Sequence, residues 1–548
     1  MLLRILTATV GCWRLLMRLH GTKTAVLCVI ALAATACSAG ASGSGAGSQG
    51  AYVRNGTFTS TLSQDPGKLD PYHTVVAAAN DLLSFTYDPL VALDDKGNPV
   101  PGIATKWHVT PSSVTLTLRK GVTCSDGSAV TPSVVSKDLD YLKDPKSASP
   151  LLGIVLPGPD FTTKADDAAG TVTITTGTPD GLLLPSLAAF FVVCGSGTAD
   201  PTALARTSSG SGPYKLTEAV PNDHYTLVRR DAYAWGPNGA RINVPGAPQK
   251  IVLKIVNNDT TAANLLTSGT LNGSIVNGPD RQRLMATMKE YRFENGGTLA
   301  VFNEHPGHPG ADPVVRKALT QALDRGQIAD VLTDRQGKIG DSTMGVPPMV
   351  CDDFGAAAGI PAFDAAAAAA ALDEAGWRKG ADGIRAKGGK RLTLTAMYSS
   401  DRPNASAGME LFSAAWKKLG VEVKVKSLNS AAFLQAVFQS DNWDVTPEIN
   451  LATQLPSQSV SFFSGPGAPK GSNFAGIHNS AYEQLVAQAV KTPGRPGCRL
   501  WTEAEKALFA RADVVPIAQR YVSYFGRGAS FEMSGEMPLP TSIRLRAH

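Results

Sequence analysis

The chain has 548 residues, of which 43% are hydrophobic and 18% are charged. It is too long for one ordinary core and too apolar for a disordered chain, so we expect about two to four domains or one large composite domain. The formal net charge is +5, but four basic residues and no acidic residue lie within the first 36, which leaves the body nearly neutral. A nearly neutral body excludes an electrostatic nucleic-acid binder, because such proteins need a basic face.

The N-terminus has the pattern of a secretory signal peptide. An apolar run at residues 25–36 follows Arg18 and Lys23 and ends in the small residues Ala-Thr-Ala. This run is shorter than the ~20 residues that a membrane-spanning helix needs. We therefore predict a signal peptide at residues 1–36, with the true start at Met1 or at Met17, from which a more compact signal peptide would begin.

The residue after this signal is Cys37, and the sequence around it resembles a bacterial lipoprotein box, with Ala34 in place of the usual Leu. In such proteins the thiol of this cysteine is acylated, and the cysteine becomes the new N-terminal residue. Simple secretion after Ala36 is the alternative. Residues 37–50 are rich in Gly and Ser and would form a flexible tether with a reach of roughly 20 Å. We expect a lipid-anchored protein on the extracytoplasmic face of the cell membrane.

Four cysteines remain once the signal peptide and Cys37 are set aside, and an even number in an oxidising compartment predicts disulfides. They are Cys124, Cys194, Cys351 and Cys498. Four cysteines allow three pairings, and the spacing alone leaves all three open. No close C-x-x-C is present, which argues against a zinc or redox site.

The body of the chain alternates short strands and helices, with helices concentrated after residue 310. Strict period-two alternation predicts strands at residues 114–118, 171–175 and 421–425. Asp312-Pro313 and Asp364 are typical helix starts, and helices are predicted after them and at 483–490 and 500–510. The apolar residues of the first helix share one face, which places Arg316 on a solvated face.

Nine short segments, taken in order, resemble the extracellular solute-binding proteins, family 5, which serve oligopeptide and dipeptide ABC importers. The resemblance runs from about Leu69 to the C-terminus. The segments are residues 87–90, 97–107, 118–127, 210–214, 302–303, 315–318, 323–325, 374–377 and 418–421.

The resemblance implies an α/β protein with a type II periplasmic-binding fold, in which a hinge joins two lobes around a ligand cleft. Lobe I would comprise residues 51–298, lobe II residues 299–513, and residues 514–548 would return to lobe I. This division favours the disulfides Cys124–Cys194 and Cys351–Cys498, because each then lies within one lobe. It also implies a monomer that delivers a peptide-like ligand to ABC permease subunits, without a cofactor and without nucleic acid.

Arg402 is the first candidate ligand residue. Residues 398–404 are similar to the segment whose arginine grips a peptide carboxylate in dipeptide-binding relatives, and a planar guanidinium can donate two parallel bonds to a carboxylate. A surface arginine that merely precedes a helix is the alternative interpretation.

A second anchor, an aspartate that holds the peptide's ammonium, is expected near residues 447–457. Leu455-Pro456 stands there in place of the usual Asp-Pro. Glu448 could replace the missing acid. Alternatively, the ligand lacks a primary amine, and Asn450, Gln454 and Ser457 supply hydrogen bonds.

Enzyme motifs are missing from the sequence: neither G-x-S-x-G, S-x-x-K nor a phosphate-binding loop is present. His305 and His308 lie in a Pro/Gly-rich stretch without further ligands, so we predict neither a metal site nor an enzyme. Three alternatives to peptide import remain. The first is a binding protein for another solute, such as haem, a nickel chelate or an oligosaccharide. The second is a surface scaffold or regulatory lipoprotein without a role in transport. The third is an unrecognised secreted hydrolase.

Overall fold

The structure, a computed structural model, describes residues 51–547 except 154–155, 157, 196, 198–199, 201 and 352–354. The predicted signal peptide, Cys37 and the tether lie outside the described residues. None of the helices within the described part is both long and apolar enough to cross a membrane.

Two four-stranded sheets form most of the first lobe. One has the order β1-β10-β9-β8 and the other the order β4-β5-β7-β6. The sheet strands are β1 (Thr57–Leu62), β4 (Ala104–Thr110), β5 (Ser113–Leu118), β6 (Phe161–Asp166), β7 (Thr171–Thr176), β8 (Tyr214–Val220), β9 (His224–Arg229) and β10 (Lys250–Ile255). The helices are α1 (Ala77–Thr86), α2 (Pro132–Lys143), α3 (Leu183–Ser186), α5 (Asp259–Ser268) and α6 (Gly278–Met285). Three strand pairs complete it: β2 (Val91–Leu93) with β3 (Pro99–Pro101), β21 (Ala529–Ser530) with β24 (Arg544–Leu545), and β22 (Met533–Ser534) with β23 (Met537–Pro538).

A larger sheet with the order β11-β20-β12-β19-β17-β18 organises the second lobe, and β13 also pairs with β20. Its strands are β11 (Gly273–Ile275), β12 (Lys289–Phe302), β13 (Lys338–Ile339), β17 (Thr393–Ser399), β18 (Glu422–Leu428), β19 (Val445–Leu451) and β20 (Val514–Gly526). A small sheet joins β14 (Arg378–Lys379), β15 (Arg385–Lys387) and β16 (Lys390–Arg391). The helices are α7 (Pro313–Gln321), α8 (Arg325–Leu332), α9 (Ala365–Glu374), α10 (Ala405–Leu419), α11 (Ser430–Gln439), α12 (Val460–Phe463), α13 (Ser480–Ala489) and α14 (Arg495–Ala510).

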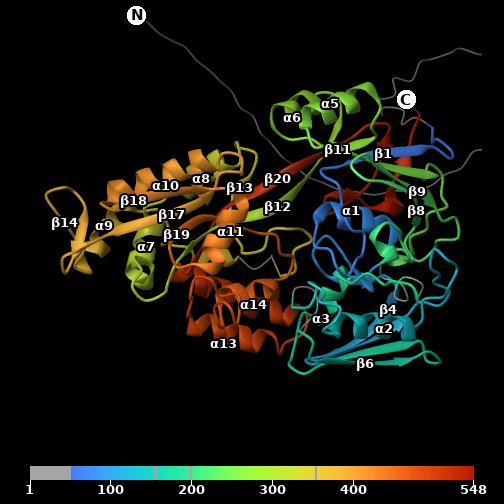
Figure 1. The fold of residues 1–548 in the computed structure, drawn as a ribbon, viewed down its shortest axis with the longest axis horizontal. Helices are drawn as coiled ribbons and strands as arrows, with labels where there is room; N and C mark the ends of the chain where they lie inside the picture. The colour runs from blue at the N-terminus through green and yellow to red at the C-terminus, as the bar shows by residue number, and fades with distance from the viewer. Residues whose placement is uncertain are drawn as a thin grey trace, which may run out of the picture. The chain divides into compact units, whose positions relative to one another are not determined.

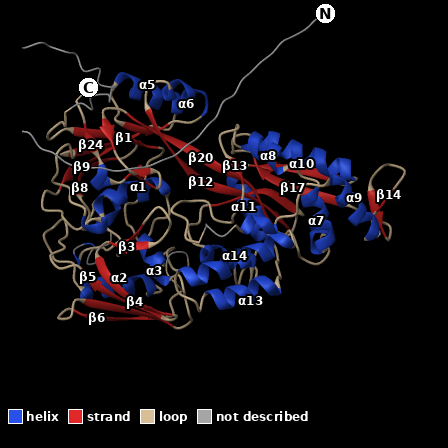
Figure 2. Cartoon of the chain, turned by 180° about the vertical axis from the view of Figure 1, so that it is seen from behind, coloured by secondary structure: helices blue, strands red, loops and turns tan. Residues whose placement is uncertain are grey.

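Helices cover both faces of this larger sheet. One buried apolar cluster joins it to helices α7 to α10, and a second joins it to α11, α13 and α14. Figure 2 shows α8 and α10 on one side of β17 and β12, with α13 and α14 on the other. Apolar residues of both sheet faces are thereby removed from water, which is the main source of stability in a layered α/β fold.

Strands β12 and β20 connect the two lobes (Figure 1). They pair antiparallel from Lys289↔Gly526 to Val301↔Val514, with bulges along the way. Near one end, Tyr524 belongs to the core of the first lobe, and near the other end Ile517 belongs to a core of the second. One pair of strands therefore contributes to the cores of both lobes. The exact boundaries at residues 298 and 513 stay a prediction.

The predicted strands and helices are present, with shifted ends. Asp312 and Asp364 accept hydrogen bonds from the first turns of α7 and α9, as capping residues do. Helix α14 begins at Arg495, five residues before the predicted start, because Pro496 occupies a first-turn position where a missing N–H costs nothing.

The prediction that Arg316 lies on a solvated face is wrong. Its side chain is 0% exposed. The guanidinium donates to Asp513 at 2.5 Å and to the carbonyl of Gly310 at 2.6 Å, and lies 3.1 Å from Glu304. The helix periodicity identified the apolar face correctly, but it could not show that two carboxylates from distant segments meet the neighbouring face.

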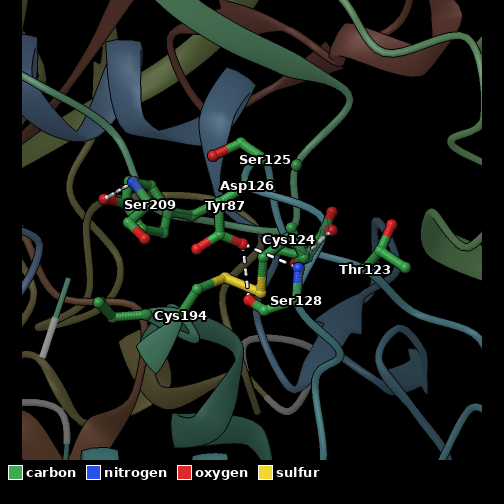
Figure 3. Close-up of a disulfide and its surroundings, with 12 residues drawn as sticks. Tyr87, Thr123, Cys124, Ser125, Asp126, Ser128, Cys194 and Ser209 are labelled. Atoms are coloured by element: carbon green, nitrogen blue, oxygen red, sulfur yellow. Dashed lines mark hydrogen bonds between the residues drawn. A yellow bond between two sulfur atoms is a disulfide. The ribbon is translucent and has the colours of Figure 1, made fainter. Parts of the chain in front are cut away.

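Among the described residues the structure has two disulfides, Cys124–Cys194 and Cys351–Cys498, which is the pairing that the two-lobe division favoured. Figure 3 shows the first of them. The backbone N–H of Cys194 donates to the carbonyl of Ser209 at 2.7 Å. The N–H of Ser209 in turn donates to the Tyr87 hydroxyl at 2.9 Å. The bridges close loops of 70 and 147 residues, so each restricts a large part of the unfolded chain.

Candidate functional site

Arg402 lies in the loop between β17 and α10. Its side chain is partly exposed, and one guanidinium nitrogen donates to the backbone carbonyl of Glu448 at 3.0 Å. Within the described part of the chain, this is the only hydrogen bond that the Arg402 side chain makes, and no carboxylate forms an ion pair with it. The guanidinium therefore keeps free donors that a bound anion could use.

Glu448 lies on β19 directly beside Arg402, but its carboxyl group is 2% exposed, and its Oε1 atom has no hydrogen-bond partner. Burial raises its pKa to about 8, although the charges of Arg402 and Arg520 act in the opposite direction. At pH 7 the group is thus mostly protonated and neutral. In this arrangement Glu448 is buried, and its contact with a ligand stays a prediction.

The strand register places Glu448, Asn450 and Arg520 on one face of the sheet. Thr298 of β12 pairs with Asn450 of β19 on one side and with Ala518 of β20 on the other. Residues directly opposite each other point to the same face, and so do residues two positions apart in one strand. Glu448 and Arg520 therefore share the face of Asn450. We call Arg402, Glu448 and Arg520 the arginine cluster.

Helix α10 covers part of this face. A methyl group added to Gly408, in its first turn, would lie 3.3 Å from Glu448 Oε1. The cluster thus lies where the helical cover of the sheet begins and the strands continue toward the first lobe. Burial lowers the pKa of Arg402; the Glu448 carboxyl opposes this, and the charge of Arg520 lowers it further.

The other three candidate residues have different surroundings. Asn450 is exposed on the cluster's face. Gln454 donates through its side chain to the carbonyl of Pro347 at 3.2 Å and so connects two loops. Ser457 is partly exposed in the short turn that follows β19. Whether any of them contacts a ligand stays a prediction.

Arg520 was missed by sequence reasoning. It is partly exposed, and its side chain makes neither a hydrogen bond nor an ion pair with any residue the structure describes. A signal was present, because Gln519 and Arg520 interrupt the apolar run Val514–Ala518 in a strand that crosses between lobes. The register across three strands connects this position with Glu448. Arg402 joins them through its bond to the Glu448 carbonyl and its charge interaction with Arg520.

The histidine pair has a structural explanation. His308 Nδ1 lies 2.8 Å from Asp444, and Nε2 lies 3.1 Å from Asp441. Burial lowers its pKa, but the bonds to Asp444 and Asp441 outweigh that effect and raise it overall. In the described segments, no group of three or more potential ligands is arranged to hold a metal ion.

The fold is that of a two-lobed binding protein, and comparison with known proteins gives the family. The profile of the bacterial extracellular solute-binding proteins, family 5, matches residues 98–468. The chain belongs to this family, whose members bind solutes and are not enzymes. The predicted α/β two-lobe fold is thereby confirmed.

Individual relatives agree with this assignment. The chain is 29% identical to protein XP55 of Streptomyces lividans over 422 residues, covering 74% of this chain and 72% of XP55. It is 25% identical to the periplasmic oligopeptide-binding protein OppA of Salmonella typhimurium, with 91% of each chain covered. A substrate-binding protein of Microbacterium hydrocarbonoxydans, solved with 4-hydroxybenzoate hydrazide, shares 28% identity with a TM-score of 0.68, covering 89% of this chain and 99% of that one.

Proposed function

We propose that this protein is the substrate-binding subunit of an ABC importer and that it captures peptides or peptide-like solutes outside the membrane. Family membership and the relatives named for oligopeptide, dipeptide and murein-peptide binding support this proposal. Ligand binding would close the lobes about β12 and β20, and permease subunits would recognise the closed form.

The observation that carries the proposal is the unfilled guanidinium of Arg402. A partly exposed arginine with a single bond to a carbonyl has donors left for a carboxylate, which two parallel charge-assisted bonds would hold. Peptides with a free C-terminus supply such a carboxylate. Asn450, exposed on the same face, would add hydrogen bonds to the ligand, and Gln454 and Ser457 would border the site. The backbone carbonyl of Glu448 would hold the Arg402 guanidinium in position through their hydrogen bond.

A second candidate function is the binding of a non-peptide solute that carries a carboxylate. It is favoured by Leu455-Pro456, which replaces the acid expected to hold a peptide ammonium, and by the burial of Glu448. A carboxylate without a neighbouring amine would satisfy Arg402 without an acidic partner.

Native mass spectrometry on the mature protein, purified from its own host without refolding, tests these candidates. An adduct of amino-acid composition supports peptide import, and an adduct of another chemistry supports the second candidate. A bare mass, combined with no thermal stabilisation by a library of short peptides, contradicts solute capture. It would favour a scaffold lipoprotein instead.

The same preparation tests the anchor. We propose that acylated Cys37 and the tether of residues 38–50 hold the protein at the membrane. Cys37→Ser should release it from washed membranes into the medium, while Ser38→Ala, a neighbouring control, should leave it bound. If the Cys37 variant stays in the membrane fraction, the anchor is elsewhere.

A further inference from the structure

Arg520 has the features of a ligand residue rather than a structural one. Within the described residues its guanidinium has neither an ion-pair nor a hydrogen-bond partner, although it is partly buried on a strand that crosses between the lobes. Structural arginines in such positions normally find carboxylates or carbonyls, because an unpaired charge away from water is unfavourable. Something other than the described protein groups is therefore expected to satisfy it.

The acidic groups nearby do not fill this role. Glu448, on the same sheet face, is buried against Gly408, and its Oε1 atom accepts no bond. Glu536 accepts a hydrogen bond from Asn295, in the β12 bulge that faces Arg520, and forms no ion pair with Arg520 in the described structure. The guanidiniums of Arg402 and Arg520 thus lie close enough for their charges to interact, and within the described residues no carboxylate forms an ion pair with either.

A carboxylate is the anion that fits two such groups. It has two oxygens with about four acceptor positions, so it can accept bonds from two guanidiniums at once. It would also relieve the repulsion between two positive charges, which is stronger in a partly buried site than in water.

We propose that Arg520 is a second ligand residue and that, together with Arg402, it forms a two-arginine clamp on the carboxylate of the bound solute. This inference rests on the proposed solute-binding function and deepens it. Arg402 belongs to the second lobe, whereas Arg520 lies on a strand whose Tyr524 packs in the core of the first. A carboxylate held by both would tie the loop before α10 to the connecting strand, and so link ligand binding to hinge closure.

A double-mutant cycle on the full mature chain tests the clamp. Variants Arg520→Ala, Arg402→Ala and the double variant would be compared by isothermal titration calorimetry. The probes are a library of two- to five-residue peptides with free C-termini and the same library with C-terminal amides. Arg520→Lys keeps the charge and guards against a variant that does not fold. Arg292→Ala is the matched control, because Arg292 stacks on Tyr521, on the opposite face of the same strand pair.

The clamp predicts that Arg520→Ala weakens binding of the free acids about tenfold or more and leaves the amides unchanged. The loss in the double variant should be smaller than the product of the two single losses, because both groups act on one carboxylate. Arg292→Ala should bind like the wild type.

Two results would overturn the proposal. If Arg520→Ala binds the free acids as the wild type does, or loses acids and amides equally, Arg520 is no part of a carboxylate site, although solute binding itself survives. If the wild type binds neither library, the peptide function fails and the clamp on a peptide carboxylate fails with it.

Discussion

The second lobe and the strand that connects it to the first contain two arginine sites that use the same groups in opposite ways. Arg316 is 0% exposed and is neutralised by Asp513, which lies 2.5 Å away and also accepts a bond from Asn479. Arg402 and Arg520 are both partly exposed. Among the described residues, the Arg402 side chain makes one hydrogen bond, to the Glu448 carbonyl, and the Arg520 side chain makes none. In both sites burial raises the pKa of a nearby glutamate, Glu304 in the first, where the charge of Asp513 raises it further, and Glu448 in the second.

The difference between the two sites is a carboxylate that forms an ion pair with the guanidinium. The Arg316 site contains Asp513, so its buried positive charge is matched within the protein. The arginine cluster contains only Glu448, which is mostly neutral at pH 7, so two positive charges remain for an external anion. An arginine that is paired with a carboxylate of the protein stabilises the lobe, whereas an arginine with free donors is available to bind a ligand.

The largest expected effect is on the free energy of unfolding, which should depend on the Arg316 site. Arg316→Ala leaves the buried Asp513 with only the more distant Arg511, 3.6 Å away, as its counter-charge. It should lower the free energy of unfolding by about 3–5 kcal/mol. Urea denaturation followed by circular dichroism would measure this. Lys317→Ala, the exposed neighbour on α7, should change it by less than about 0.5 kcal/mol. Equal effects of the two substitutions would show that the Arg316 network adds nothing to stability.

The second-largest expected effect is on ligand affinity, which should depend on the arginine cluster and not on the Arg316 site. Arg402→Ala should weaken binding of the solute recovered from the host about 10- to 150-fold, because charge-assisted hydrogen bonds are lost. It should leave the urea midpoint nearly unchanged, since Arg402 makes one internal bond. Calorimetry and denaturation on the same protein samples would measure both quantities. A large loss of stability without a loss of affinity would place Arg402 among the structural arginines.

The smallest effect concerns pH. The raised pKa of Glu448 means that the carboxyl is protonated below about pH 8 and ionised above it. Once ionised, it competes with the ligand for Arg402 and Arg520, so affinity should fall about three- to tenfold between pH 7 and pH 9. Glu448→Gln should remove this fall and keep the affinity at pH 7. Glu410→Gln, an exposed position on α10, should retain the wild-type pH profile. A Glu448→Gln protein with that same profile would contradict this role.

Local patterns predicted a large part of the fold. Alternation located the strands at residues 114–118 and 171–175, and the aspartate caps located α7 and α9, because these signals depend on neighbouring residues alone. The burial of Arg316 and the approach of Arg520 to Arg402 depend on segments more than 100 residues apart, which no local pattern records. Arg402 itself was suggested by resemblance, whereas the burial of Glu448 became visible only once α10 was seen to cover β19.

The most direct test is a crystal structure of the protein with the solute that native mass spectrometry identifies. We predict a carboxylate of that solute within about 3 Å of guanidinium nitrogens of Arg402, with Glu448 still buried. A solute bound elsewhere, with Arg402 bonded only to the Glu448 carbonyl, would contradict the proposed role of Arg402.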